Sequence, residues 1–141
     1  MPNFKALIED FRSGRFPQPP VAKLVDFRIV HLEVGSARME MDADERHWNP
    51  MGTLHGGVLC DIADAAMGMA FATTLDEGQN FTTIELKINF LRPVIKSHLV
   101  AVGKVISRGR TIGLVECDVT NPEGKLVAKA ASTCIVLKNQ T

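Results

Sequence analysis

The sequence has no excess of charge of either sign, because 16 Lys and Arg balance 16 Asp and Glu in 141 residues. A neutral chain is poorly suited to broad electrostatic binding of nucleic acid or of an anionic membrane. No run approaches the roughly 20 uncharged apolar residues that a membrane span requires. Residues 1–11 lack a basic segment followed by a long apolar run, so no signal peptide is predicted and we expect a cytoplasmic protein.

Cysteine and histidine are scarce and widely spaced. The three cysteines, Cys60, Cys117 and Cys134, match no metal-binding spacing, and the apolar surroundings of Cys60 and Cys134 favour buried, reduced thiols. The four histidines include no pair four residues apart on a predicted helix. The Gly-x-Ser-x-Gly elbow of serine hydrolases, phosphate-binding loops and dinucleotide fingerprints are also absent. We therefore expect neither a metal nor a redox cofactor.

The hydrophobic pattern predicts a short N-terminal region followed by one domain. Residues 3–12 read as an amphipathic helix, Gly14 ends it, and the prolines of residues 16–20 indicate an extended linker. We place the N-terminal helix and linker at residues 1–24 and the domain at residues 25–141. Inside the domain, residues 44–54 are expected to form a loop. The expected elements are strands at 27–34 and 37–41, a helix at 55–75, and strands at 81–91, 99–107, 111–120 and 125–137.

The long helix at residues 55–75 is apolar on nearly every side, as expected of a helix that is buried all round. Six strands can cover such a helix only if the sheet curls around it. The sequence therefore predicts an α+β fold, with a curved antiparallel sheet of about six strands wrapped around one long buried helix. A sheet of this kind keeps two free edges, so we also expect dimerisation through an edge strand.

The stretch from Asn49 to Gly57 runs directly into this helix, and Asp64 lies further along it. Free N–H groups at a helix start attract negative charge, including the oxyanion of an acyl-transfer reaction. A carboxylate in apolar surroundings can serve as a base or a nucleophile. Asp61 lies on the same helical stripe as Asp64, and either carboxylate could instead reach solvent or bond a backbone N–H.

The spacing of these groups restricts how they can cooperate. Gly56 and Asp64 are eight residues apart, which is about 12 Å along a helix. One reacting carbon cannot contact oxyanion donors at Gly56 and also lie within about 3.5 Å of Asp64 on the same helix. If both groups act on one substrate, they must come from different subunits. A two-fold dimer with antiparallel helices would provide that arrangement twice.

The chain resembles the hotdog-fold acyl-CoA thioesterases in three features. These are the order of its elements, the run from Gly52 to Gly57 with its His55-Gly56-Gly57, and the Asp nine residues after the His. The subgroup that this chain resembles is the phenylacetyl-CoA, or aromatic-catabolism, type. The resemblance covers about residues 25–137. It implies hydrolysis of acyl-CoA thioesters to a carboxylic acid and free coenzyme A, with coenzyme A as part of the substrate and no other cofactor.

The resemblance also implies a role for each matching residue. Gly56 would donate its backbone N–H to the thioester carbonyl oxygen, and His55 would orient that region. Asn49 would position the carbonyl or the attacking water, and Asp64 of the partner subunit would act as general base or nucleophile. Thr83 would hold the water or the carboxylate. These five residues are the predicted catalytic set.

Coenzyme A phosphates would lie near basic loops in this family. The candidates are Arg108, Arg110 and Thr111 in one predicted turn, with Arg92 and Lys87 as weaker ones; the alternative is an ordinary solvated hairpin. The resemblance further implies a homodimer or a homotetramer formed from two dimers. Three points stay open. The protein could be a non-catalytic acyl-CoA sensor on the same fold, and the acyl group is not identified. The N-terminal helix and the proline segment could cap either the acyl pocket or the edge of the fold.

Overall fold

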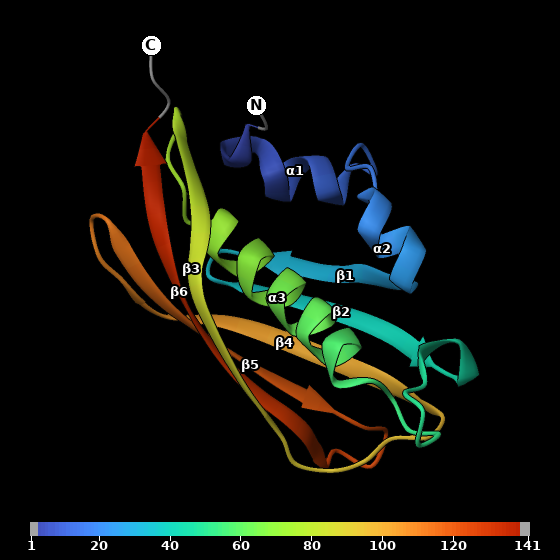
Figure 1. Cartoon of the computed structure of the whole chain (residues 1–141). Coiled ribbons are helices and arrows are strands. Elements are labelled where there is room, and N and C mark those ends of the chain that lie inside the picture. The colour runs from blue at the N-terminus through green and yellow to red at the C-terminus, as the bar shows by residue number, and fades with distance from the viewer. Residues whose placement is uncertain (1–2, 139–141) are drawn as a thin grey trace.

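A computed structural model describes residues 3–138 as a curved six-stranded sheet around one long helix (Figure 1). All neighbouring strands are antiparallel, in the order β1-β2-β4-β5-β6-β3, so β1 and β3 form the two edges. The predicted α+β hotdog fold is therefore confirmed. The strands are β1 (Phe27–Glu33), β2 (Ser36–Ala43), β3 (Gln79–Phe90), β4 (Ser97–Arg108), β5 (Ile112–Thr120) and β6 (Leu126–Lys138), and the central helix is α3 (Gly56–Ala72).

Helix α3 is buried against the inner face of the sheet, with eight of its side chains in the core. It approaches β4 so closely that a Cβ atom on Gly103 would lie 2.4 Å from the carbonyl oxygen of Ala66. A glycine is therefore required where the helix crosses this strand. The helix ends at Ala72, earlier than the predicted residue 75. The hydroxyls of Thr73 and Thr74 donate to carbonyl oxygens one turn back, which satisfies acceptors at the helix end.

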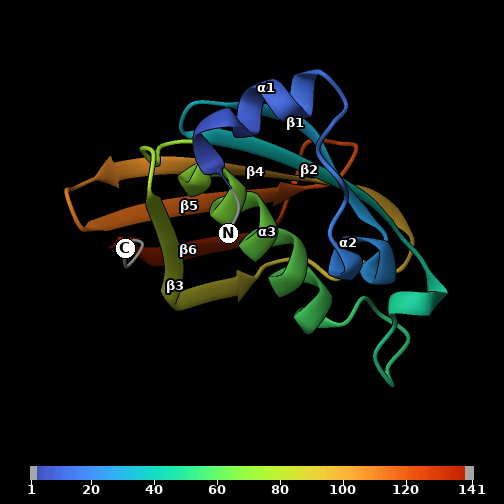
Figure 2. The ribbon, with the colours of Figure 1, turned by 90° about the horizontal axis from the view of Figure 1, so that it is seen from above.

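The N-terminal region lies along β1, and only its first part reaches across α3 toward β3 (Figures 1 and 2). It consists of a 3₁₀ turn, η1 (Phe4–Ala6), and the helices α1 (Leu7–Arg12) and α2 (Pro20–Val25). Both helices contact β1, while the Phe4 ring packs edge-on against Phe81 of β3 at 5.8 Å.

The second of these helices, α2, was not predicted, because the prolines of residues 16–20 read as an extended linker. Pro20 is the first residue of α2, where its fixed φ and missing N–H are tolerated. The predicted helix at residues 3–12 is found as η1 and α1 together. Leu7 and Ala22 are buried in the same core as the sheet, so this region is part of the packed domain.

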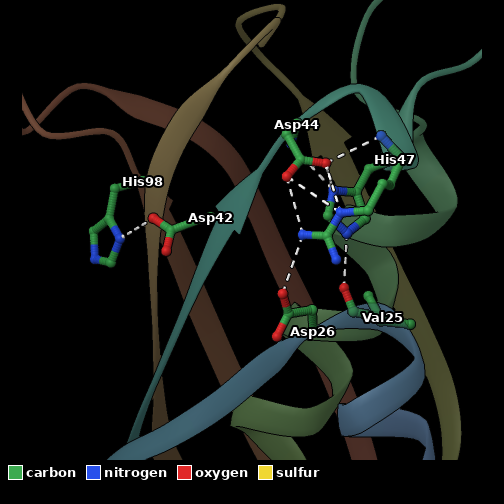
Figure 3. Close-up of polar contacts among 7 residues, drawn as sticks. Val25, Asp26, Asp42, Asp44, His47 and His98 are labelled. Atoms are coloured by element: carbon green, nitrogen blue, oxygen red, sulfur yellow. Dashed lines mark hydrogen bonds and ion pairs between the residues drawn. The ribbon is translucent and has the colours of Figure 1, made fainter.

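The predicted loop at 44–54 contains a 3₁₀ turn, η2 (Glu45–His47), that is bonded to the end of α2. The Arg46 guanidinium pairs with Asp26 at 3.1 Å, and Nε2 of His47 lies 2.7 Å from the carbonyl oxygen of Val25 (Figure 3). The stretch that precedes Asn49 is thereby held against the N-terminal region. Local sequence could not predict these contacts, because the partners are about 20 residues apart.

A histidine and two carboxylates form a separate cluster on the outer face of the sheet. Nδ1 of His98 lies 2.8 Å from Asp42 (Figure 3). Nε2 of the same ring lies 2.8 Å from Glu40. Hydrogen bonding to Glu40, and then to Asp42, raises the pKa of His98. The protonated ring is therefore favoured in the folded protein.

No helix within residues 3–138 is both long enough and apolar enough to cross a lipid bilayer.

Candidate active site

The loop before α3 is shaped by the side chain of Asn49. Its Oδ1 accepts hydrogen bonds from the N–H groups of Met51 (2.9 Å) and Thr53 (3.2 Å), and its Nδ2 donates to the Thr53 hydroxyl at 2.9 Å. Gly52 completes the turn with φ of +77°, a conformation that favours glycine. Asn49 therefore fixes the backbone next to the helix start, and both ends of its amide are already engaged in the loop.

The start of α3 leaves one backbone donor available. The side chain of His55 caps the helix, because its Nδ1 accepts the N–H of Gly57 at 2.8 Å. The N–H of Val58 bonds the His55 carbonyl at 3.0 Å. Within residues 3–138, no acceptor is found for the N–H of Gly56. His55 thus determines which donor stays free, and that donor is the one predicted to hold the thioester oxygen.

Gly56, whose N–H is free, lines a cavity of about 410 Å³. Asn49, Thr53 and Arg92 line the same cavity, and so does the Phe90 ring, which lies directly against Gly56. A Cβ atom on Gly56 would lie 2.8 Å from Cζ of Phe90. The structure therefore brings together three of the predicted residues, Asn49, Gly56 and Arg92, beside the ring of Phe90.

Asp64 and Thr83 both line a different cavity of about 300 Å³, on the side of α3 that faces the N-terminal region. Apart from these two and Gln18, its wall is apolar. Its lining residues come from the N-terminal region, β1, β2, α3 and β3, and they are Phe4, Phe16, Gln18, Pro19, Val21, Ala22, Phe27, Ile29, Met39, Asp64, Ala65, Gly68, Met69, Ala72, Phe81 and Thr83. Thr82, the neighbour of Thr83, is exposed and does not line this cavity.

Asp61 and Asp64, the two carboxylates of α3, are partly desolvated by their surroundings. Desolvation, and then the negative charge of Asp61, raises the pKa of Asp64. Desolvation also raises the pKa of Asp61, and the nearby His55 partly opposes that shift. Asp64 is nevertheless exposed to solvent in the single chain. A carboxylate with a raised pKa is a stronger base once ionised, which suits general base catalysis.

Within one chain, the free N–H and the carboxylate are separate. Gly56 and Asp64 line different cavities and lie about 12 Å apart along α3. Asp64 also lines a shallow depression with Asp61 and residues of β3, the strand that forms a free sheet edge. That edge exposes 58% of Ile84, so an apolar side chain faces outward beside the carboxylate.

The predicted coenzyme A residues are divided between the two ends of α3. Arg92 lies beside Gly56, whereas Arg108 lies at the far end, with its Nε donating to Thr74 at 3.0 Å and its guanidinium 5.1 Å from the Phe71 ring centre. The 17 residues of α3 separate the two ends by about 25 Å. Arg110 and Thr111 follow Arg108 in an exposed hairpin, and Lys87 is exposed on β3.

Sequence reasoning left open that the N-terminal region caps the acyl pocket, but it named no residue of that region for the wall of the Asp64 cavity, because α2 was not predicted. It also did not predict the contact of Phe90 with Gly56, which arises only when the end of β3 meets the start of α3. Among residues 3–138, no group of three or more His, Cys, Asp and Glu side chains is arranged to hold a metal ion.

Comparison with known proteins identifies the family of the chain. The family model described as the thioesterase superfamily matches residues 51–128. A Saccharolobus solfataricus protein named as an esterase is 34% identical over 96% of this chain and 94% of its own length. Human acyl-coenzyme A thioesterase 13 is 30% identical over 74% of this chain and 76% of its own length.

Among solved structures, a phenylacetic acid degradation-related protein from Ralstonia eutropha JMP134, titled as a thioesterase, superposes with a TM-score of 0.81. It is 29% identical and covers 95% of this chain and 99% of its own. The resemblance found in the sequence motif is thereby confirmed. The chain belongs to the thioesterase superfamily and is a thioester hydrolase of the hotdog fold.

Proposed function

We propose that this protein hydrolyses acyl-CoA thioesters at sites shared between two subunits. The observation that carries the proposal is the separation of the free Gly56 N–H from the Asp64–Thr83 pair, which lie in different cavities of one chain. Each cavity holds one half of a hydrolytic site. The human relative named as an acyl-coenzyme A thioesterase supports coenzyme A esters as the substrate class.

In the proposed reaction, the thioester carbonyl oxygen accepts a hydrogen bond from Gly56 of one subunit. Asp64 of the partner subunit takes a proton from water, and the oxygen of that water attacks the carbonyl carbon. The resulting oxyanion is stabilised at the positive end of α3. The C–S bond then breaks, the carboxylic acid is released, and the coenzyme A thiolate is protonated. Thr83 would hold the water or the carboxylate, a role that its position in the wall of the Asp64 cavity supports.

The free edge of the sheet provides a surface for the required dimer. Strand β3 lies at the end of the sheet, next to the shallow depression that contains Asp64. Antiparallel pairing of two β3 edges about a two-fold axis would join the sheets and bring two α3 helices side by side in opposite directions. Each dimer would then contain two sites. The pairing of such dimers into a homotetramer stays a prediction from the family resemblance.

Binding of the coenzyme A portion is assigned first to Arg92, because it lines the cavity of the Gly56 donor. Arg110 and Thr111 are exposed and free to meet phosphates from a neighbouring subunit. Arg108 is a weaker candidate than its spacing suggested, since Thr74, Gln79 and the Phe71 ring already engage its guanidinium.

The proposal is tested by measuring free thiol released from a panel of aromatic and aliphatic acyl-CoAs. We expect turnover by the native protein and a loss of several orders of magnitude in Asp64→Ala. Size measurement by ultracentrifugation should give a dimer or a tetramer. A fully active monomer would contradict the shared site. Tight binding of an ester that is never hydrolysed would favour the alternative, an acyl-CoA sensor.

A further inference from the structure

A buried thiol contacts the hydroxyl of Thr83. Cys134 lies on β6 at the position that pairs with Thr83 of β3, and it is fully buried. Its Sγ atom lies 3.7 Å from Oγ1 of Thr83, at the distance of a thiol–hydroxyl hydrogen bond in which either atom could donate. Thr83 also lines the cavity and the shallow depression that contain Asp64. The side chain of Thr83 therefore connects the thiol to the space around that carboxylate.

The supply of protons decides the direction of this hydrogen bond. A threonine hydroxyl carries one proton, and an ionised carboxylate can only accept, whereas sulfur is a weak acceptor. To hold the Asp64 carboxylate, Thr83 must donate its one proton to that carboxylate, which leaves its oxygen free to accept. Burial, and to a smaller extent the negative charge of Asp64, raises the pKa of the Cys134 thiol. The thiol therefore keeps its proton at neutral pH and can donate it to Thr83.

Resting on the proposed function, we propose that Cys134 is a positioning residue, whose S–H donates to Oγ1 of Thr83 and directs the hydroxyl proton toward the Asp64 carboxylate. The paired strands hold the sulfur and the hydroxyl opposite each other. A hydroxyl oriented in this way supports the carboxylate throughout the reaction, whereas a freely rotating hydroxyl does so only part of the time. Cys134 lines neither the cavity nor the depression that contains Asp64, so it acts only through Thr83.

The test is a double-mutant cycle that compares the native protein, Cys134→Ala, Thr83→Val and the double variant. The release of coenzyme A is followed from the acyl-CoA that the native protein hydrolyses best. Cys134→Ala removes the S–H and should lower kcat by about 2- to 5-fold, the effect of one weak neutral hydrogen bond, with KM unchanged. In Thr83→Val, which lacks the hydroxyl, the same replacement should leave kcat unchanged. A purely structural role of the thiol would lower kcat equally in both backgrounds.

Cys117→Ala is the matched control for the loss of a buried thiol. Cys117 is 1% exposed on the neighbouring strand β5, and its Sγ donates to the carbonyl oxygen of Asp118, away from Thr83. This variant should keep the native kcat. Cys134→Val, which fills more of the space of the thiol, is the second variant in case the alanine perturbs folding.

The outcomes separate this inference from the proposed function. An equal loss of kcat from Cys134→Ala in both backgrounds, or no loss relative to Cys117→Ala, overturns the role of Cys134 while hydrolysis itself stands. A native protein that hydrolyses none of the esters overturns the proposed function, and the role of Cys134 with it. A loss that occurs only when the Thr83 hydroxyl is present supports both.

Discussion

The free N–H of Gly56 can be removed without removing the helix that carries it. Gly56 is the first residue of α3, a position where proline is well tolerated because its N–H has no helical partner. His55, which would precede the proline, has φ of −64° and ψ of 132°, the extended conformation that a residue before proline prefers. Gly56→Pro should therefore fold and keep the orientation of α3.

The proline also introduces a Cβ atom, and the structure shows what that atom would meet. It would lie 2.8 Å from Cζ of Phe90, so the ring must move. Phe90 is 55% exposed and its ring can shift toward solvent. Gly56→Ala introduces the same Cβ atom but keeps the N–H. The alanine variant is therefore the matched control for the displacement of Phe90.

Loss of one oxyanion donor typically raises the barrier by about 3 kcal/mol, which is about 100- to 1,000-fold in kcat. We expect Gly56→Pro to be slower than Gly56→Ala by that factor when thiol release is followed with a good acyl-CoA substrate. Circular dichroism and urea unfolding establish that both variants are folded. Equal rates in the two variants would refute the assignment of the Gly56 N–H as the oxyanion donor.

Three further predictions concern charge and packing. Asp61→Asn removes the negative charge that raises the pKa of Asp64, so the acid limb of the pH profile of kcat/KM should move to lower pH. An acid limb that does not move would count against Asp64 as the base. The raised pKa of His98 gives stability that is fully present below about pH 6.5 and is lost as pH rises through the folded-state pKa. His98→Asn should therefore lose less stability between pH 6 and pH 8 than the native protein in urea unfolding, whereas equal losses would show that the cluster contributes nothing. Gly103→Ala should cost about 1–3 kcal/mol, because its Cβ would lie 2.4 Å from the Ala66 carbonyl, and an unchanged urea midpoint would contradict this account of the packing.

The order of the elements could be predicted because each pattern was local. Apolar and polar residues alternate along the strands, and the apolar run that forms α3 is too long for a strand. The turn from Asn49 to His55 also depends on contacts between residues only a few positions apart, so its motif could be recognised in the sequence. Local patterns of this kind located the helix start and Asp64.

The remainder of the site depends on contacts between distant segments. The proline run was read as a linker, although Pro20 begins α2 and thereby places Gln18 beside the Asp64 cavity. Phe90 is 34 residues from Gly56, and no periodicity predicts that the two touch. The assignment of Arg108 to coenzyme A rested on its place in a predicted turn. The structure instead shows it bonded at the C-terminal end of α3.

The central claim is that each site combines Gly56 of one subunit with Asp64 of the partner subunit. The most direct test is a hybrid dimer made from one Gly56→Pro subunit and one Asp64→Ala subunit, co-expressed with different affinity tags and purified through both. One of its two sites keeps both groups, so we predict about half of the native activity per dimer, although each parent variant is nearly inactive. A hybrid as inactive as its parents would contradict the account.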